Sequence, residues 1–147
     1  AAAAAKSSGS ASVRIVGPKG ARTVSVEKFP VLPTDDARRE TVLGPGEIVT
    51  EIVLPPSRGT RSSYRKVRDR AAWDFALAGV ALAIQLSGGV ISKARVVLSG
   101  AAPIPWRSKE AEQAIIGQKV DGAVASKAAE AALRNLPSDT WTVTVPA

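Results

Sequence analysis

The sequence predicts an α+β fold in which an antiparallel sheet carries helices packed on one of its faces. Two observations support this prediction. β-rich segments separated by turn signals fill the chain as far as Leu98, and both helical patterns come after them. With 147 residues, 45% of them hydrophobic, the chain is long enough for one ordinary domain, or for one small domain and the tail of another.

The first half of the chain predicts strands and one long loop. Residues 12–27 form two β-rich segments around the turn signal Gly17–Gly20, which indicates a hairpin. Residues 29–43 contain two prolines and several charges without a sustained period, so we expect a surface loop with room for a helical turn. Residues 46–54 and 62–68 alternate in the manner of strands, and we expect these two strands to be neighbours.

The second half predicts a hairpin followed by two helices. Residues 76–86 and 90–98 are apolar and β-rich segments joined by Ser87-Gly88-Gly89, a tight-turn signal. Ser108 is the expected N-cap of a short helix that ends near Gly117. Asp121 is the expected N-cap of a second helix that runs to Pro137, and residues 141–145 are expected to be extended.

Composition excludes several classes of function. The chain has no cysteine, histidine or methionine, so it supplies no disulfide, no iron–sulfur ligand and no Ser–His–Asp triad. No apolar run is long enough to span a bilayer. The net charge of +7 allows binding to an acidic partner or nucleic acid, but Tyr64 is the only ring within the basic stretch of residues 58–70, so nucleic acid is not the expected partner.

Neither glycine-rich stretch matches a nucleotide-binding motif. The stretch Gly17–Gly20 lacks the spacing of a phosphate-binding loop and the helix that should follow it. The stretch Gly44–Gly46 precedes a strand and does not fit the dinucleotide fingerprint. Both are expected to be turns.

One short stretch holds residue types suited to a cofactor. Lys66, Trp73, Asp74 and Phe75 lie close together where a predicted strand leads into the apolar hairpin. A fixed lysine offers charge and hydrogen bonds to an electron-rich ring, and an aromatic side chain offers a flat surface for stacking. The alternative is structural, with Trp73 and Phe75 as core anchors and Lys66 as an exposed strand residue.

Four segments in order resemble one protein family: GPKGARTVSVEKF, VLPTDDARRETVLGPGEIVTEIVLPP, SYRKVRDRAAWDFALAGVAL and ARVVLSGAAPIPWRSKEAEQAIIG. From about Val13 to Ala132, the chain resembles the flavoprotein (medium) subunit of the molybdenum hydroxylases, which include xanthine dehydrogenase, carbon monoxide dehydrogenase and bacterial aldehyde oxidoreductases. The resemblance implies that residues 12–56 are the C-terminal tail of an FAD-binding domain and that residues 57–147 are the flavoprotein C-terminal α+β domain. Residues 1–11 are then a linker or a segment of uncertain assignment.

The resemblance also implies a cofactor and the residues that contact it. Ile48 and Val49 would lie on the strand against the isoalloxazine ring of FAD, and Lys66 would reach the flavin from the next strand. Asp74 and Phe75 match an acidic-plus-aromatic pair beside the ring, with Phe75 in place of a tyrosine found in some members. Trp73 is a further neighbour.

The partners implied by the resemblance lie on other polypeptides. Electrons would reach FAD from an iron–sulfur subunit, after hydroxylation on a molybdopterin-binding subunit, and the chain itself would contribute no catalytic residue. Nothing before Val13 resembles the family's glycine-rich FAD loops, so an upstream FAD-binding segment must complete the site. The expected compartment is the cytoplasm, or the periplasm by co-export. The competing hypothesis is a stand-alone basic module that binds an acidic partner or nucleic acid without a cofactor.

Overall fold

A computed structural model describes residues 10–57, 59–70 and 73–136. The chain divides into two compact units, residues 1–58 and residues 59–147. No helix in the described part of the chain is long and apolar enough to cross a membrane.

The first unit is a three-stranded antiparallel sheet with strand order β2-β1-β3. Its elements are β1 (Ser12–Gly17), β2 (Gly20–Ser25), the 3₁₀ helix η1 (Val26–Lys28) and β3 (Ile48–Val53). The predicted hairpin of β1 and β2 is confirmed, and Val13 and Ile15 of β1 are the buried hydrophobic residues of this sheet. Most of the segment between η1 and β3 is a loop, as predicted.

The predicted pairing of β3 with the next strand along the chain is wrong. β3 pairs with β1 across the long loop, whereas β4 (Thr60–Val67) pairs with β5 in a separate sheet. Pro55 and Pro56 follow β3, and because proline lacks an N–H donor they favour the end of the strand at this point.

Glu47 connects the loop that precedes β3 to the β1–β2 hairpin through hydrogen bonds. Its carboxylate accepts hydrogen bonds from Arg22 Nε at 2.8 Å, from Arg22 Nη2 at 2.7 Å and from the Gly44 N–H at 2.6 Å. These hydrogen bonds, with the positive charge of Arg22, lower the pKa of Glu47 from 4.5 to about 2.

We expect the ion pair of Glu47 to make the first unit sensitive to acid. Because the folded pKa is depressed, the contribution of Glu47 to stability is present above pH 4.5 and is lost as the pH falls towards about 2. An NMR titration of the Glu47 side chain should have its midpoint near the lower value, and Arg22→Ala should move that midpoint up. A midpoint that is the same with and without Arg22 would contradict the prediction.

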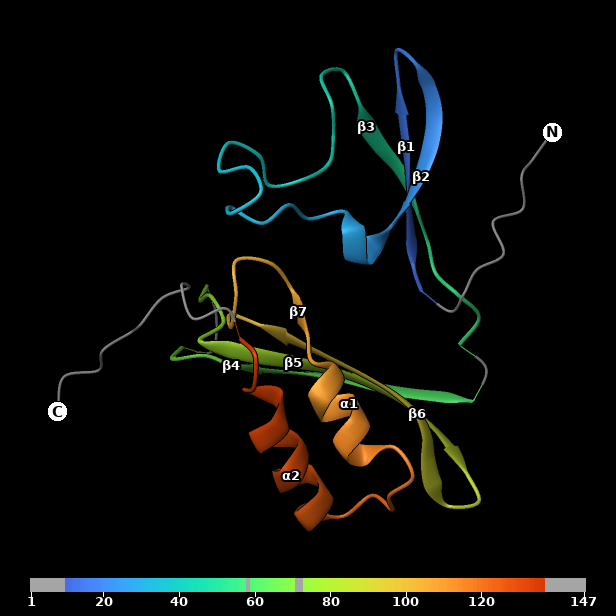
Figure 1. The fold of residues 1–147 in the computed structure, drawn as a ribbon, viewed down its shortest axis with the longest axis vertical. Coiled ribbons are helices and arrows are strands. Elements are labelled where there is room, and N and C mark those ends of the chain that lie inside the picture. Colours follow the sequence, from blue (N-terminus) through green and yellow to red (C-terminus); the bar gives the residue numbers. More distant parts are fainter. Residues whose placement is uncertain (1–9, 58, 71–72, 137–147) are drawn as a thin grey trace, which may run out of the picture. The chain divides into compact units, whose positions relative to one another are not determined.

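The second unit is a four-stranded antiparallel sheet with two helices on one face (Figure 1). After β4 come β5 (Ala78–Ser87), β6 (Val90–Ser99), β7 (Trp106–Arg107), α1 (Lys109–Ile115) and α2 (Gly122–Ala132). The strand order β4-β5-β6-β7 follows the chain, and the turn between β5 and β6 uses Gly88 and Gly89 at positive φ. The predicted α+β architecture is confirmed.

Both helices begin where the sequence predicts, but α2 is shorter than expected. The Ser108 Oγ accepts the N–H of Ala111, and the Asp121 carboxylate accepts the N–H of Val124. α2 ends at Ala132 instead of near Pro137, because Asn135 adopts a left-handed φ of +59° that a helix cannot contain. The predicted extended segment 141–145 lies outside the described residues.

Glu112 joins α1 to the sheet. The residue is 5% exposed, and its Oε1 accepts the N–H of Val96 in β6 at 3.1 Å, while Arg107 donates from Nε at 2.8 Å and from Nη2 at 2.8 Å. Burial raises the pKa of Glu112, but the hydrogen bonds from Arg107 and Val96 and the charges of Arg107 and Arg95 outweigh it and hold the pKa below its usual value.

Candidate functional site

The candidate site is the connection between β4 and β5. Lys66, near the end of β4, donates from Nζ to the backbone carbonyl of Asp74 at 2.7 Å. At the base of the connection the N–H of Leu77 donates to the carbonyl of Val67 at 2.9 Å. The structure therefore brings Lys66 next to the backbone of Asp74, the residue that precedes Phe75, as expected from their proximity in the sequence.

The Asp74 carboxylate accepts hydrogen bonds from backbone groups of the same β4–β5 connection. Its Oδ2 accepts the N–H of Asp69 at 3.0 Å and the N–H of Arg70 at 2.8 Å. The sequence places an acid here but does not reveal these bonds, because the donors are backbone groups that every non-proline residue carries.

Trp73 and Phe75, here called the aromatic tip, are exposed. Trp73 is 98% exposed and Phe75 is 94% exposed, so neither is a core anchor in this structure and the structural alternative for these two side chains is wrong. Trp73 also has a φ of +55°, an unfavourable conformation for a bulky residue. Strained backbone and fully exposed aromatic rings at one place are typical of a binding surface.

A polar row that sequence reasoning missed lies beside Lys66 on the sheet. Lys66 pairs with Gly79 of β5, which pairs with Ser99 of β6, so the three residues share one face. Tyr64 lies two residues before Lys66 on the same face, and its hydroxyl lies 3.3 Å from the Ser99 Oγ. A Cβ on Gly79 would lie 2.4 Å from that Oγ and 2.9 Å from the Tyr64 hydroxyl, so the contact depends on glycine. Gly79 could have indicated this contact from the sequence, because a glycine inside a strand often marks a close approach by other groups.

Ile48 and Val49 belong to the first unit. Ile48 opens β3 opposite Val16 and is 63% exposed, and Val49 lies opposite Ile15 and is partly buried. Adjacent residues of a strand point to opposite faces, so the two side chains leave the sheet on different sides. The other three predicted residues, Lys66, Asp74 and Phe75, belong to the second unit.

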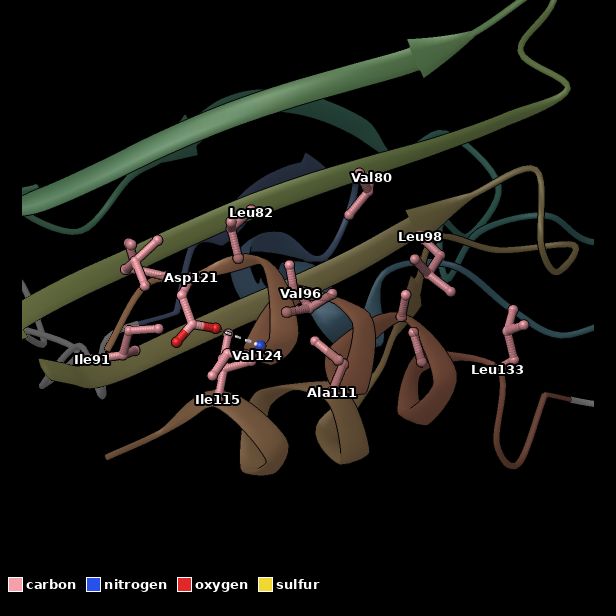
Figure 2. Close-up of a pocket in the computed structure, with 16 residues that line it drawn as sticks. Val80, Leu82, Ile91, Val96, Leu98, Ala111, Ile115, Asp121, Val124 and Leu133 are labelled. Carbon is pink, nitrogen blue, oxygen red and sulfur yellow. Dashed lines mark hydrogen bonds between the residues drawn. The ribbon is translucent and has the colours of Figure 1, made fainter. Parts of the chain in front are cut away.

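A hollow of about 470 Å³ lies between the sheet and the helices of the second unit (Figure 2). Its lining is apolar and includes Val80, Leu82, Val96, Leu98, Val124 and Leu133. Asp121 is the charged residue of the lining, and its carboxylate caps α2 through the Val124 N–H at 2.8 Å, drawn as the dashed line in Figure 2. The hollow thus offers contacts for packing without convergent polar groups for chemistry.

No acidic cluster in the described residues is arranged as a metal site. The chain has neither cysteine nor histidine, which are common ligands of soft metals. Binding through Lys66 and the aromatic tip is the chemistry that these residues support.

Comparison with protein families finds a match to the CO dehydrogenase flavoprotein C-terminal domain over residues 62–145, more than half of the chain. The chain is 41% identical over 101 residues to the aldehyde oxidoreductase FAD-binding subunit PaoB of Escherichia coli, covering 68% of this chain and 30% of that protein. It is 42% identical over 76 residues to the glyceraldehyde dehydrogenase medium chain of Sulfolobus acidocaldarius, covering 52% of this chain and 27% of that protein.

A solved structure shows the same fold. The carbon monoxide dehydrogenase of Hydrogenophaga pseudoflava superimposes with a TM-score of 0.72 and 31% identity, over 84% of this chain and 41% of the matched chain. In each of these comparisons the present chain spans less than half of its relative's length.

Proposed function

Because the chain belongs to the family of CO dehydrogenase flavoprotein C-terminal domains, we propose that it forms part of the FAD-binding, electron-transfer subunit of a molybdenum-containing hydroxylase. Three relatives are named as FAD-binding or medium subunits of aldehyde oxidoreductase, glyceraldehyde dehydrogenase and carbon monoxide dehydrogenase, which supports this class of function. In this role the chain contributes no catalytic residue of its own.

The observation that carries the proposal is the pairing of a fixed ammonium group with an exposed aromatic surface. Lys66 is oriented by its hydrogen bond to the Asp74 carbonyl, and the two rings of the aromatic tip are nearly fully exposed. A flat heteroaromatic ring with carbonyl oxygens and ring nitrogens fits these groups, because the rings supply apolar contact and Lys66 supplies a charged donor. The residues present therefore fit a flavin.

FAD, when bound, would accept electrons from an iron–sulfur subunit and deliver them to an acceptor. The chain's own residues would hold one side of the ring. We propose that Ile48, Val49, Lys66, Asp74 and Phe75 are residues of the flavin site, with residues 12–56 as the tail of an FAD-binding domain and residues 57–147 as the flavoprotein C-terminal domain.

The proposed partners follow from the same role. An upstream FAD-binding segment would supply the remaining walls of the site, and a molybdopterin-binding subunit would carry the hydroxylation. Aldehyde or xanthine dehydrogenase-like chemistry is the proposed class for the whole complex. We place that complex in the cytoplasm, or in the periplasm if a partner subunit exports it.

The substitution Lys66→Ala tests the proposal. In the chain assembled with its upstream segment, the loss of a charged donor should weaken FAD affinity about tenfold or shift the flavin midpoint potential. Equilibrium dialysis with detection of flavin by absorbance would measure the FAD affinity. A redox titration would measure the midpoint potential. The matched control is Lys93→Ala, which removes an exposed lysine from β6 and should change neither quantity.

Unchanged flavin content and spectrum in Lys66→Ala would exclude the proposed role of Lys66. If the assembled protein binds no flavin but binds a polyanion with affinity that falls steeply as salt is added, the chain is instead a basic binding module.

A further inference from the structure

We propose that Asp74 is a positioning residue that holds Lys66 and the aromatic tip in place for the flavin, instead of contacting the flavin itself. The inference rests on the proposed function and specifies what one member of the site does. It differs from the role that the family resemblance implies for Asp74, which is a direct place beside the ring.

The first observation is that the Asp74 carboxylate already has partners within the chain. Its Oδ2 accepts two backbone N–H groups, those of Asp69 at 3.0 Å and Arg70 at 2.8 Å. Asp74 is partly buried, whereas its two neighbours in the sequence are 98% and 94% exposed. The acid therefore points back into its loop while both rings point outward.

The second observation is that Asp74 is fixed at its backbone as well as at its side chain. Its carbonyl accepts the Lys66 ammonium at 2.7 Å, and the Leu77 N–H closes the base of the connection on the Val67 carbonyl at 2.9 Å. Because the carboxylate and the backbone carbonyl of Asp74 are both held by hydrogen bonds, we expect the backbone on either side to hold Trp73 and Phe75 in one orientation. The same contact sets the direction of the Lys66 ammonium.

The third observation is the φ of +55° at Trp73, directly before Asp74. A bulky residue stays in this region only where surrounding contacts over-determine the backbone. The hydrogen bonds of Asp74 are such contacts. Without them, we expect the backbone at Trp73 to relax and the tip to lose its fixed presentation.

Positioning by hydrogen bonds and direct action by charge respond differently to one substitution. Asn keeps an acceptor oxygen in the place of Oδ2 but carries no charge, whereas Ala removes the acceptor altogether. If Asp74 works by positioning, Asp74→Asn should lie closer to the unsubstituted protein than to Asp74→Ala, because it keeps both hydrogen bonds in a weaker, neutral form. If Asp74 works by placing its charge at the flavin, Asp74→Asn should behave as Asp74→Ala and should shift the potential.

The experiment uses three variants and two readouts. The variants are Asp74→Asn, Asp74→Ala and the control Asp69→Asn, which removes a negative charge from the same loop but leaves the Asp69 N–H in place. The first readout is hydrogen exchange of the Asp69 and Arg70 amides in the 147-residue chain, measured by NMR. The second is FAD affinity and flavin midpoint potential in the chain assembled with its upstream segment.

We expect Asp74→Ala to raise exchange of both amides and to weaken FAD affinity, each about tenfold. Asp69→Asn should stay within about twofold of the unsubstituted protein in both readouts. Asp74→Asn, whose neutral oxygen accepts the same two N–H groups more weakly than a carboxylate does, should lose only part of what Asp74→Ala loses, with no change in potential.

Two results would overturn the inference. One is amide protection that is unchanged in Asp74→Ala, and the other is an Asp74→Asn variant that keeps amide protection but loses FAD affinity or shifts the potential. Failure of the proposed function has a different signature, because it appears as an unsubstituted complex without flavin. That result would overturn the inference with it, whatever the exchange data show.

Discussion

Replacement of Glu112 by alanine is expected to lower the free energy of unfolding of the second unit by about 2–3 kcal/mol. The substitution removes the acceptor for the Val96 N–H and leaves Arg107, whose side chain is 23% exposed, without its bidentate carboxylate. Loss of the carboxylate leaves the buried Val96 N–H without its acceptor and removes the charge-assisted hydrogen bonds of Arg107, and both changes cost free energy at the junction of helix and sheet. Urea unfolding followed by circular dichroism would measure the change.

Glu130→Ala is the matched control for Glu112→Ala, because it removes the same charge from an exposed position of α2 and should change stability by at most about 0.5 kcal/mol. The prediction fails if Glu112→Ala lowers stability by no more than this control.

The dependence of stability on acid gives an independent check of the role of Glu112. Since the pKa of Glu112 is lowered in the fold, its contribution is present above the ordinary glutamate pKa and disappears as the pH falls through the folded value.

The double substitution Trp73→Ala and Phe75→Ala is expected to weaken FAD affinity about 100-fold in the assembled subunit. Both rings are almost completely exposed in the free chain, so their contact area becomes buried only when a partner or cofactor covers them. The stability of the isolated chain should therefore stay unchanged. Flavin titration by fluorescence quenching measures the affinity, and urea unfolding measures the stability.

Val120→Ala is the control for the aromatic tip, because Val120 is also an exposed apolar residue, at 64%, in the segment between α1 and α2. It should leave FAD affinity unchanged. If the double variant binds FAD as tightly as this control, the tip is not part of the flavin site.

Local signals were enough to predict most of the elements. Two glycines at positive φ set the β5–β6 turn, and the capping side chains of Ser108 and Asp121 set the helix starts. These features depend on residues within a few positions of each other, so they can be predicted from one sequence without knowledge of the fold.

Features that depend on distant residues were missed. The pairing of β3 with β1 and the short strand β7 are set by partners elsewhere in the sheet. Nothing in the sequence distinguishes the buried Glu112 from exposed glutamates before α1 is docked on β6. In the candidate site, the proximity of Lys66 to Asp74 was predictable, but the two amides bound by Asp74 and the contact of Tyr64 with Ser99 were not.

The strand order of the second sheet also bears on how the chain folds. Because β4, β5, β6 and β7 pair in the order in which they occur, the second unit is built from contacts of low sequence separation. In the first unit, β3 must close a long loop before it reaches β1. Low contact order favours fast folding and loop closure slows it. The second unit should therefore complete its sheet first, although it leaves the ribosome after the first unit.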